Sequence, residues 1–370
     1  MSTLTFGIEE EFVLLDPSSL ATVDVGAQAV AELRAAGAGV THEFRASQVE
    51  YVSPVLTRAA EALAELTVFR RHLYDWSRAH GVLACGAGTP YDIGAGSRVH
   101  ADARYERIAD DIAGLADEHQ INGLHVHVAR TDRDDGVDAS NALRPWLPLL
   151  LALSADSPFW RGRDTGFASW RALHGRRWTT HGIPPLFADA ADLDRTVSAH
   201  GGLGATSDAG TVNWNVRVSA THSTVEVRVC DAQLSADDAV PLAALIRALV
   251  DGRTRDVRPV EPAAGVWDAA LWHAARHGLS GTLLDPVSAT VGPARHAVRS
   301  LLAAAGPALT AHGDLDLVEG FLGRILRFGT GARRQWDARR HGVPALAQLY
   351  RDAMAHPQHE ARRTASARVP

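Results

Sequence analysis

Residues 4–15 read LTFGIEEEFVLL, an apolar run that carries three consecutive glutamates in its middle. The run is rich in apolar and β-branched residues and is followed by the turn sequence DPSS, so it predicts a β-strand. Because side chains alternate along a strand, Glu9 and Glu11 share one face and Glu10 points to the other. Two carboxylates on an apolar strand repel each other and are costly to desolvate, which a divalent cation would offset. The alternative is a solvated edge strand.

A second predicted strand, residues 121–129, carries two histidines at the same spacing. His125 and His127 share one face, where an imidazole can bind a metal or donate a hydrogen bond to an anionic oxygen. The alternative for each histidine is a core residue whose hydrogen bonds are satisfied.

A third predicted strand, residues 48–52, places Glu50 between apolar neighbours. Glu50 therefore also faces away from the core layer. Glu43 reads as an ordinary surface residue.

The fourth polar strand belongs to a predicted hairpin with strands at residues 212–219 and 223–230. Glu226 and Arg228 share one face of the second strand, while the valines between them pack in the core. Two interpretations stay open. The pair is either a structural ion pair or a metal ligand next to a guanidinium that grips phosphate oxygens.

The first strand of that hairpin also has a polar face, with Asn213, Asn215 and Arg217 on the same side. Across the hairpin, this face lies beside Glu226 and Arg228. These residues are therefore further candidates for the same site.

Four strands thus present chargeable side chains on one face of a sheet. Short adjacent strands in the first two-thirds of the chain predict an antiparallel or mixed α+β sheet, not a doubly wound parallel one. Several carboxylates with arginine and histidine are typical of an oxygen-rich site for Mg²⁺ and a nucleotide, whereas zinc sites are richer in His and Cys. The sequence has no GxxxxGK[ST] loop, so nucleotide binding of the P-loop type is excluded.

Residues 156–188 contain Gly, Pro, Trp and Arg without a clear period. Ordered loops of this length are usually functional, and we expect this one to cover the site. Arg163 and Arg171 are candidates for binding a substrate carboxylate. The alternative is that both are surface charges of a loop.

The remaining long segments read as helices. Residues 139–155 predict one helix, and residues 235–356 predict a helical C-terminal part with breaks at 258–262 and at 306–307. The polar residues 357–370 predict a frayed tail.

Composition bounds the class of protein. With 370 residues, 46% of them hydrophobic, the chain is long enough for a large core. A net charge of −6 favours neither a general nucleic-acid binder nor a membrane-surface protein. The longest apolar stretch is too short to span a bilayer and the N-terminus lacks a signal-peptide pattern, so we expect a cytoplasmic protein. Cys85 and Cys230 are expected to be free buried thiols.

The order of the motifs resembles one known family, the carboxylate–amine ligases, also called glutamate–cysteine ligase type 2. The resemblance covers nearly the whole chain. It rests on GIEEE at 7–11, SQVE at 47–50, CGAGTP at 85–90, GLHVHV at 123–128, DTGFAS at 164–169, GIPP at 182–185, TVEVRVCD at 224–231, WHAARHGL at 272–279 and GARRQ at 331–335.

The resemblance implies a fold like that of glutamine synthetase and the guanido kinases. In that fold a curved, mainly antiparallel sheet forms an active-site funnel and is flanked by helices. It implies a single catalytic domain over residues 1–370, and it favours a homodimer.

The resemblance also implies ATP and Mg²⁺ or Mn²⁺ as cofactors, small amino acids as substrates, and the conversion of ATP, glutamate and cysteine to γ-glutamylcysteine, ADP and phosphate. The family's metal-binding positions are matched by Glu9, Glu11, Glu50 and Glu226. A position at the metal and the ATP phosphates is matched by His125 and His127, and the arginine beside the γ-phosphate by Arg228. We add Arg217 as a second catalytic arginine and Asn215 as a nucleotide contact.

The chain departs from the family pattern in places. Members read Trp-Asp-Ile-Arg-Pro where residues 214–218 read WNVRV, so a carboxylate is absent at Asn215. Pro90 and Ala46 differ as well. These departures bear on the substrate more than on the ATP chemistry, because the metal-site glutamates are retained.

Three other functions stay open. One is a guanidine phosphotransferase on the same type of sheet, and another is a metal-dependent hydrolase that uses His125 and His127. The third is a non-catalytic nucleotide-binding homologue, which the change at Asn215 permits.

Overall fold

β1 (Phe6–Leu15) lies inside a seven-stranded sheet in the computed structural model, which describes residues 4–206, 209–251 and 265–355. The strands follow the order β2-β3-β1-β5-β9-β8, β4 also pairs with β1, and these pairings are antiparallel. The interpretation of β1 as a solvated edge strand is therefore wrong. The other strands of this sheet are β2 (Val40–His42), β3 (Gln48–Val52), β4 (Leu83–Cys85), β5 (Gly123–Ala129), β8 (Val216–Val218) and β9 (Thr224–Asp231).

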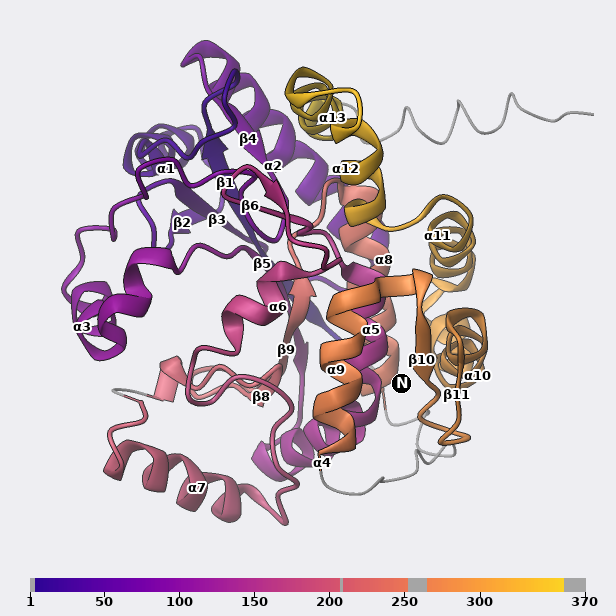
Figure 1. Ribbon diagram of the computed structural model, residues 1–370. Helices are drawn as coiled ribbons and strands as arrows, with labels where there is room; N and C mark the ends of the chain where they lie inside the picture. Colours follow the sequence, from indigo (N-terminus) through magenta and orange to yellow (C-terminus); the bar gives the residue numbers. More distant parts are fainter. Residues whose placement is uncertain (1–3, 207–208, 252–264, 356–370) are drawn as a thin grey trace, which may run out of the picture.

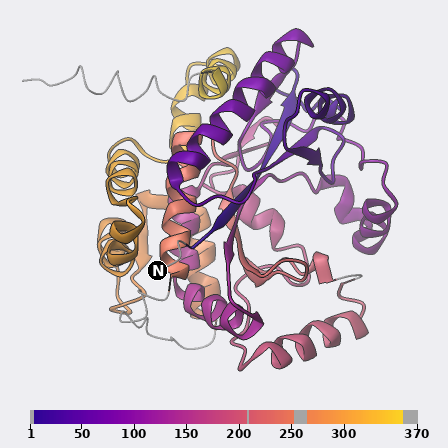
Figure 2. The same cartoon turned by 180° about the vertical axis from the view of Figure 1, so that it is seen from behind.

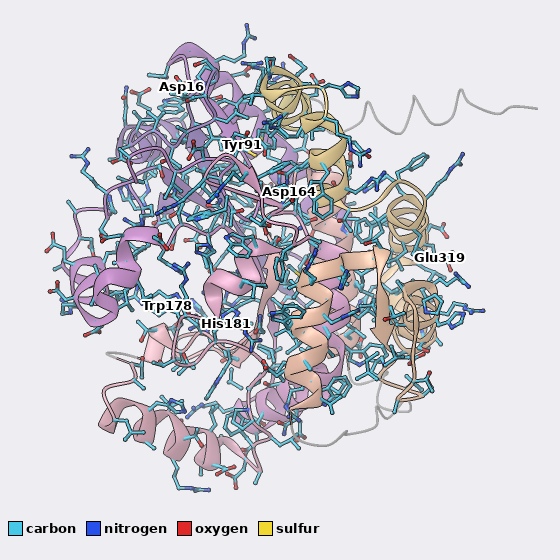
Figure 3. The ribbon with its side chains drawn as sticks, viewed as in Figure 1. Asp16, Tyr91, Asp164, Trp178, His181 and Glu319 are labelled. Carbon is cyan, nitrogen blue, oxygen red and sulfur yellow. The ribbon has the colours of Figure 1, made fainter. Side chains whose placement is uncertain are left out.

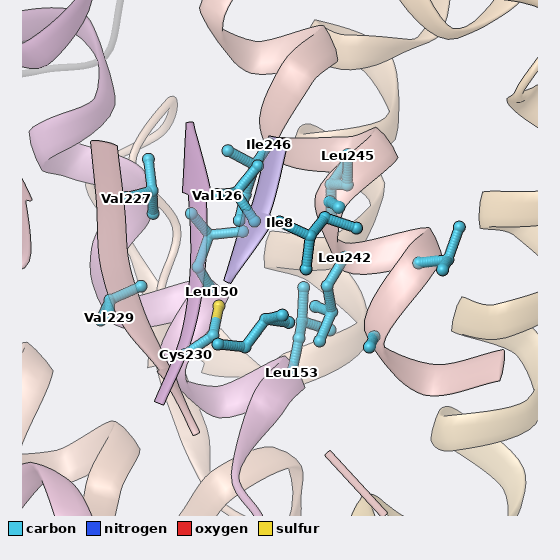
Figure 4. Packing of buried hydrophobic residues seen from close by; sticks show 14 of the residues in the cluster. Ile8, Val126, Leu150, Leu153, Val227, Val229, Cys230, Leu242, Leu245 and Ile246 are labelled. Atoms are coloured by element: carbon cyan, nitrogen blue, oxygen red, sulfur yellow. The ribbon is translucent and has the colours of Figure 1, made fainter. Parts of the chain in front are cut away.

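One face of the sheet is apolar and is covered by helices. Ile8, Val126 and Val227 are fully buried on this face, and they pack against leucines of α5 (Leu147–Ser154) and α8 (Ala236–Val250), as Figure 4 shows. Burial of each such side chain contributes roughly 1.5–3 kcal/mol, so this layer contributes much of the fold's stability. The long helix α2 (Ala59–Ala79) packs beside α8, and α1 (Gly26–Ala35) packs beside α2.

The C-terminal part is mostly helical; its first three helices pack against α5 and α8, whereas its last helix packs against α2 and β4 (Figures 1 and 2). It consists of α9 (Val266–His277), η5 (Gly278–Ser280), α10 (Ala294–His312), α11 (Leu315–Phe328), α12 (Gly331–Arg339) and α13 (Val343–Ala355). A short hairpin of β10 (Thr282–Leu284) and β11 (Val291–Pro293) interrupts it, so the expectation of helices alone was wrong.

The break predicted at Gly306-Pro307 is also absent, because α10 runs through both residues. A proline inside a helix loses one backbone hydrogen bond. Packing offsets that loss, since α10 contacts α8 and α11 through fully buried residues such as Leu301 and Leu309. The predicted break at 258–262 and the tail at 357–370 lie outside the described residues.

Within the residues that the structure describes, no layer of long helices covers the other face of the sheet, which we call the open face. Shorter elements surround it, with α3 (Ala103–Ile112) and α7 (Ala190–Gly202) on that side in Figure 1. The irregular segment 156–188 contains the hairpin of β6 (Phe159–Trp160) and β7 (Arg163–Asp164) and the short helix α6 (Trp170–Gly175). Short 3₁₀ turns follow α3 and precede β8, namely η1 (Ala113–Glu118) and η3 (Ala209–Thr211).

The single helix expected at 139–155 is three elements. α4 (Arg133–Leu143) begins earlier, where Asp132 accepts a hydrogen bond from the backbone of Asp135, and η2 (Arg144–Trp146) then leads into α5. The prolines at the starts of η2 and α5 explain the interruption, because proline suits the first turn of a helix but not its interior.

The predicted α+β fold with a mainly antiparallel sheet flanked by helices is confirmed. None of the helices in the described part of the chain has both the length and the apolar character needed to cross a membrane.

Candidate active site

The register of β1 brings its outward glutamates next to polar residues of both neighbouring strands. Glu9 lies opposite His125 of β5, and Glu11 lies opposite Glu50 of β3. Glu10 points to the helical side instead. The alternation predicted from the sequence is confirmed, and the open face of the sheet carries a row of polar side chains.

β9 continues this row. His127 of β5 lies opposite Glu226, and Glu226 lies opposite Arg217 of β8. The register between β5 and β9 shifts around His125, which is the mark of a β-bulge. Bulges re-aim side chains next to active sites. Here Nη1 of Arg228 lies 3.5 Å from Nδ1 of His125.

Carboxylates and imidazoles come together in two groups that could hold metal ions. Glu9, His125 and Glu226 each offer a ligand atom within 4.8 Å of the others, and Glu11, Glu50 and His125 form a second such group. His125 belongs to both, with Nδ1 3.5 Å from Glu9 and Nε2 3.8 Å from Glu11. Because carboxylate oxygens outnumber imidazoles, the donor set fits Mg²⁺ or Mn²⁺ better than zinc.

The carboxylates at one end of the row are short of positive charge. Burial raises the pKa of Glu11 to about 8, and the nearby charge of Glu43 adds to the shift. Burial also raises the pKa of Glu50 well above its ordinary value, with further contributions from Glu43, Glu9 and Glu11. Carboxylates this close resist ionising together. A divalent cation would supply the missing charge, so these residues fit a bound metal.

Glu43 is not the ordinary surface residue that the sequence indicated. It follows β2 and lines the same cavity as Glu50, and burial raises its pKa. The sequence reading missed Glu43 because β2 has only three residues and shows no alternation.

Two arginines offset the negative charge of Glu226. It accepts hydrogen bonds from Nε of Arg217, at 2.7 Å, and from Nη1 of Arg228. Burial alone would raise the pKa of Glu226, but Arg228 and Arg217 hold it below its ordinary value. The ion pair considered from the sequence therefore exists. Both arginines also line the cavity on this face, so the pair is part of the candidate site.

That cavity, which we call the cleft, has a volume of about 260 Å³. Part of its lining is the polar row of the sheet, and the rest comes from segments outside the sheet. Among the latter are Phe44, Tyr105, His119, Trp178 and His181. The rings of His119 and Trp178 meet edge to face, with centroids 4.9 Å apart. Figure 3 shows Trp178 and His181 on the open side of the sheet, near α6.

The sequence reading missed this aromatic part of the cleft. Single aromatic residues in loops and on α3 carry no pattern that separates a lining residue from a packing residue. His119 is buried and His181 is half-buried. Burial lowers the pKa of His119 well below its ordinary value and that of His181 to about 3. Both imidazoles are therefore neutral at pH 7.

Arg171 of α6 lines the cleft although its side chain is almost fully buried. Its Nη2 donates to the backbone oxygen of Arg228 at 3.1 Å, and its Nη1 lies 4.0 Å from Asp231. Burial lowers the pKa of Arg171, while the charges of Asp231 and Glu11 favour its protonated form. The interpretation of Arg171 as a surface charge of a loop is wrong. Its contact with a substrate carboxylate stays a prediction.

Asp231, at the end of β9, anchors the segment that leads to α6. Its carboxylate accepts hydrogen bonds from the backbone of Asp156 and from the hydroxyls of Ser157 and Ser169, all between 2.6 and 2.8 Å. The hydroxyl of Ser157 in turn accepts from the backbone of Arg171 at 3.0 Å. The irregular segment is thus tied to the sheet by buried hydrogen bonds, which places Arg171 beside the polar row.

Gly123 makes room for two of these side chains. A Cβ atom here would lie 2.5 Å from Nη2 of Arg171 and 2.7 Å from Nε2 of His125. The backbone nitrogen of Gly123 donates to Glu11 at 2.8 Å. Any larger residue would displace side chains of the cleft.

Other predicted site residues do not line the cleft. Arg163 is exposed in the hairpin of β6 and β7, so its predicted contact with the substrate has no support in this geometry. Asn215 is buried, and its backbone oxygen accepts a hydrogen bond from the backbone nitrogen of Arg228 at 2.8 Å. Within the described residues, its side-chain Oδ1 accepts no hydrogen bond. His127 is also not part of the lining, and its Nε2 lies 3.3 Å from the carboxylate of Glu9. The roles of Asn215 and His127 stay predictions.

Comparison with known sequences identifies related proteins. The sequence model of glutamate-cysteine ligase family 2 (GCS2) matches residues 5–364. A relative from Salinispora arenicola is 39% identical over 344 residues, which cover 90% of each chain. Another from Rhodopirellula baltica is 34% identical and covers 90% of this chain and 92% of its own. Both are provisionally named glutamate–cysteine ligase 2.

Solved structures share the fold at low sequence identity. The glutamate–cysteine ligase of Francisella tularensis in complex with AMP matches with a TM-score of 0.69 at 12% identity, over 97% of this chain and 90% of its own. The bifunctional glutathione synthetase of Pasteurella multocida matches with a TM-score of 0.70 at 15% identity, over 96% of this chain. The chain spans about half of that bifunctional protein, 52% of its length.

Proposed function

The chain belongs to glutamate–cysteine ligase family 2, an ATP-dependent carboxylate–amine ligase family, and from that premise we propose that it forms γ-glutamylcysteine. In the proposed reaction, ATP and the γ-carboxylate of glutamate give an acyl phosphate and ADP. The amine of cysteine then displaces phosphate, forming the amide bond.

The observation that carries the proposal is the mixed charge of the cleft. Its carboxylates outnumber the nearby cations at the end with Glu11 and Glu50, whereas two guanidinium groups, those of Arg217 and Arg228, border it near Glu226. A ligase that transfers the phosphoryl group of ATP needs both features, since metal ions and arginines share the charge of the phosphates.

We propose Mg²⁺ or Mn²⁺ as the metal, held by Glu9, Glu11, Glu50 and Glu226 with His125. Bound there, the metal would neutralise phosphate oxygens of ATP and hold the nucleotide in place. The neighbouring carboxylate of Glu43 would add to the negative charge that retains it.

The chain's own residues would contact the transferred phosphoryl group, orient the substrate and exclude water. Arg228 and Arg217 are placed to contact the charge that develops on the transferred phosphoryl group, and their planar forks suit phosphate oxygens. Arg171 would orient the amino-acid substrate through its carboxylate. The aromatic lining, including Trp178, would exclude water that would otherwise hydrolyse the acyl phosphate. His181, neutral at pH 7, can accept a hydrogen bond from the incoming amine.

The experiment measures ADP release and product mass with ATP, Mg²⁺ and glutamate, in the presence and absence of cysteine and a panel of other amines. We expect ADP release to depend on both acid and amine and to match the amount of amide formed. Phosphorylation of a guanidine without amide formation would contradict the proposal. So would turnover that needs zinc but no ATP. ADP release by the Arg228→Ala variant measures the background ATP hydrolysis of the preparation.

We further propose a homodimer and a cytoplasmic location. The family resemblance favours the dimer, and size-exclusion chromatography with light scattering would test it. Dependence on ATP and two buried free cysteines, Cys85 and Cys230, support a reducing compartment. Fractionation of cells that produce the protein would test its location.

A further inference from the structure

A second cavity, of about 540 Å³, lies where three sequence motifs meet that the cleft does not use. DTGFAS at 164–169 forms one side, and residues from WHAARHGL at 272–279 and from the helix that begins GARRQ at 331–335 form the others. Among the described residues, none lines both this cavity and the cleft. Figure 3 shows Tyr91 and Asp164 beside α12, well apart from Trp178 and His181. We call it the arginine cavity.

The lining of the arginine cavity is strongly basic. It contains the guanidinium groups of Arg276, Arg333, Arg339 and Arg340, and a single carboxylate, that of Asp164. Asp164 is already engaged, because its Oδ1 accepts hydrogen bonds from the indole of Trp336 at 3.0 Å and from the backbone of Gly166 at 2.8 Å. The cavity therefore carries an excess of positive charge.

Two of the arginines are held by aromatic rings instead of by carboxylates. The guanidinium of Arg276 lies over Phe167, 5.2 Å from the ring centroid, and that of Arg339 lies over Tyr91 at 5.6 Å. Nε of Arg339 also donates to the hydroxyl of Tyr91 at 2.9 Å. Within the described part of the chain, neither arginine forms an ion pair.

Such contacts orient a guanidinium without neutralising it. A ring beneath the plane restricts the side chain, while the outer N–H groups stay available to an anion in the same plane. The other two arginines differ, because Arg333 and Arg340 both pair with Asp337, at 2.9 and 3.4 Å, and are more exposed. Arg276 and Arg339 are thus the half-buried, pre-oriented cations of the cavity.

We propose that the arginine cavity binds a small anion with at least two charged groups, either phosphates or carboxylates. Its volume falls in the roughly 300–1,000 Å³ range of small-molecule sites. Gly162 and Gly166, both with positive φ, let the backbone border the cavity without side chains. The indole of Trp336 offers an apolar surface for the body of the ligand. The site does not depend on the proposed ligase reaction.

The experiment is calorimetric titration of the full-length protein with two probes, tripolyphosphate and citrate, at low salt and without divalent metal. Without metal, the cleft lacks the cation proposed to bind phosphate there, so binding in the cleft is weakened. We expect at least one probe to bind. Binding of tripolyphosphate alone identifies a phosphate ligand, binding of citrate alone a carboxylate ligand, and binding of both a site that accepts either.

Variants then locate the bound probe. Arg276→Ala and Arg339→Ala should each weaken binding about tenfold or more, as expected for loss of a charged hydrogen bond. Arg276→Lys keeps the charge and serves if Arg276→Ala does not fold. The matched control is Arg71→Ala, which removes an exposed arginine paired with Asp75 on α2 and should leave binding unchanged.

The proposal is overturned if neither probe binds, or if the control weakens binding as much as the cavity variants do. It is also overturned if only Arg228→Ala abolishes binding, because the probe would then occupy the cleft. None of these measurements requires turnover, so their failure is distinct from failure of the proposed ligase activity.

Discussion

Glu9, Glu10 and Glu11 are neighbours in the chain, yet their carboxylates meet three different surroundings. Glu9 contacts two imidazoles, and Glu11 is buried among other carboxylates. Glu10 is fully buried on the helical face, where its Oε2 lies 2.8 Å from Nη2 of Arg70. The alternation of a single strand therefore separates metal-site glutamates from a glutamate of the core.

We predict that Glu11→Gln lowers steady-state ADP release by more than the roughly 10–100-fold that is typical for loss of an outer-shell partner of a metal. The reason is that an amide oxygen binds Mg²⁺ much more weakly than a carboxylate. Glu9→Gln and Glu226→Gln should behave in the same way. Circular dichroism would show that each variant is folded.

Glu10→Gln is the matched control, and we expect it to lower stability instead of turnover. Breaking a buried ion pair should cost about 3 kcal/mol of unfolding free energy, visible as a lower urea midpoint, while kcat of the folded enzyme stays near normal. Loss of turnover in Glu10→Gln together with normal turnover in Glu11→Gln would show that the faces of β1 are assigned wrongly.

Arg228 tests whether the cleft transfers a phosphoryl group. We predict that Arg228→Ala lowers kcat about 10³–10⁵-fold with a smaller effect on KM, because the contact is made mainly in the transition state. Arg228→Lys should recover only part of the loss, since lysine lacks the planar fork. Steady-state kinetics with thermal unfolding as a fold control would measure this. A near-normal kcat for folded Arg228→Ala would remove the residue from the mechanism.

At the scale of elements, ion pairs at the start of α8 connect this helix to α11 and α12. Asp238 is buried there and accepts hydrogen bonds from Arg324 of α11, at 2.5 Å, and from Arg334 of α12, at 2.9 Å. The hydroxyl of Ser235, before the helix, donates to it at 2.7 Å. Burial opposes the charge of Asp238, but Arg334 and Arg324 hold its pKa below the ordinary value.

Asp238 should therefore make the stability of the fold sensitive to acid. A carboxyl whose pKa is lowered in the folded state stabilises the protein above its unfolded pKa, about 3.9, and loses this effect as the pH falls toward the folded pKa. We predict that Asp238→Asn costs about 3 kcal/mol at pH 7, and that the difference from wild type shrinks below pH 4. Urea unfolding across this pH range would measure it.

The control for Asp238 is Asp75→Asn, which breaks an exposed pair with Arg71 on α2. Exposed pairs contribute roughly 0–1 kcal/mol, so this variant should differ little from wild type at any pH. A constant effect of Asp238→Asn from pH 7 to pH 3 would contradict the role of its charge.

At the scale of the whole molecule, the two faces of the sheet differ in the side chains that they carry and in how these affect stability. The helical face is an apolar core, while the open face places carboxylates opposite one another, as buried Glu11 and half-buried Glu50 are. Like charges directly opposite each other on neighbouring strands destabilise a sheet. The open face is therefore a place where function and stability conflict.

This conflict predicts how metal and stability are linked. Mg²⁺ or Mn²⁺ should raise the unfolding temperature of the wild type, by an amount equivalent to about 2.7 kcal/mol at 100 times Kd. Glu50→Gln removes one of the opposed carboxylates, so it should be more stable than wild type without metal and gain less from added metal. Calorimetric melting with EDTA and with a metal series would test both. A wild-type unfolding temperature that metal does not change would argue against a metal site in the cleft.

The sequence by itself determined β1, β3, β5 and β9, their polar faces and the class of fold. Alternation is a consequence of strand geometry, so the face of Glu9, Glu11 and Glu226 follows from counting residues. The segment 48–52 matches β3 at both ends for the same reason. These properties are local and need no knowledge of distant contacts.

Only the tertiary structure decided which residues from outside the sheet complete the cleft. Glu43 follows a strand too short to show a pattern, and Arg171 reaches the cleft only because buried hydrogen bonds tie its segment to the end of β9. Arg163, eight positions earlier in the same segment, stays exposed. Pro307 sits at an exposed position inside α10, a helix whose buried face packs against α8 and α11. In each case the outcome depends on packing between segments far apart in the chain, which local residue patterns do not contain.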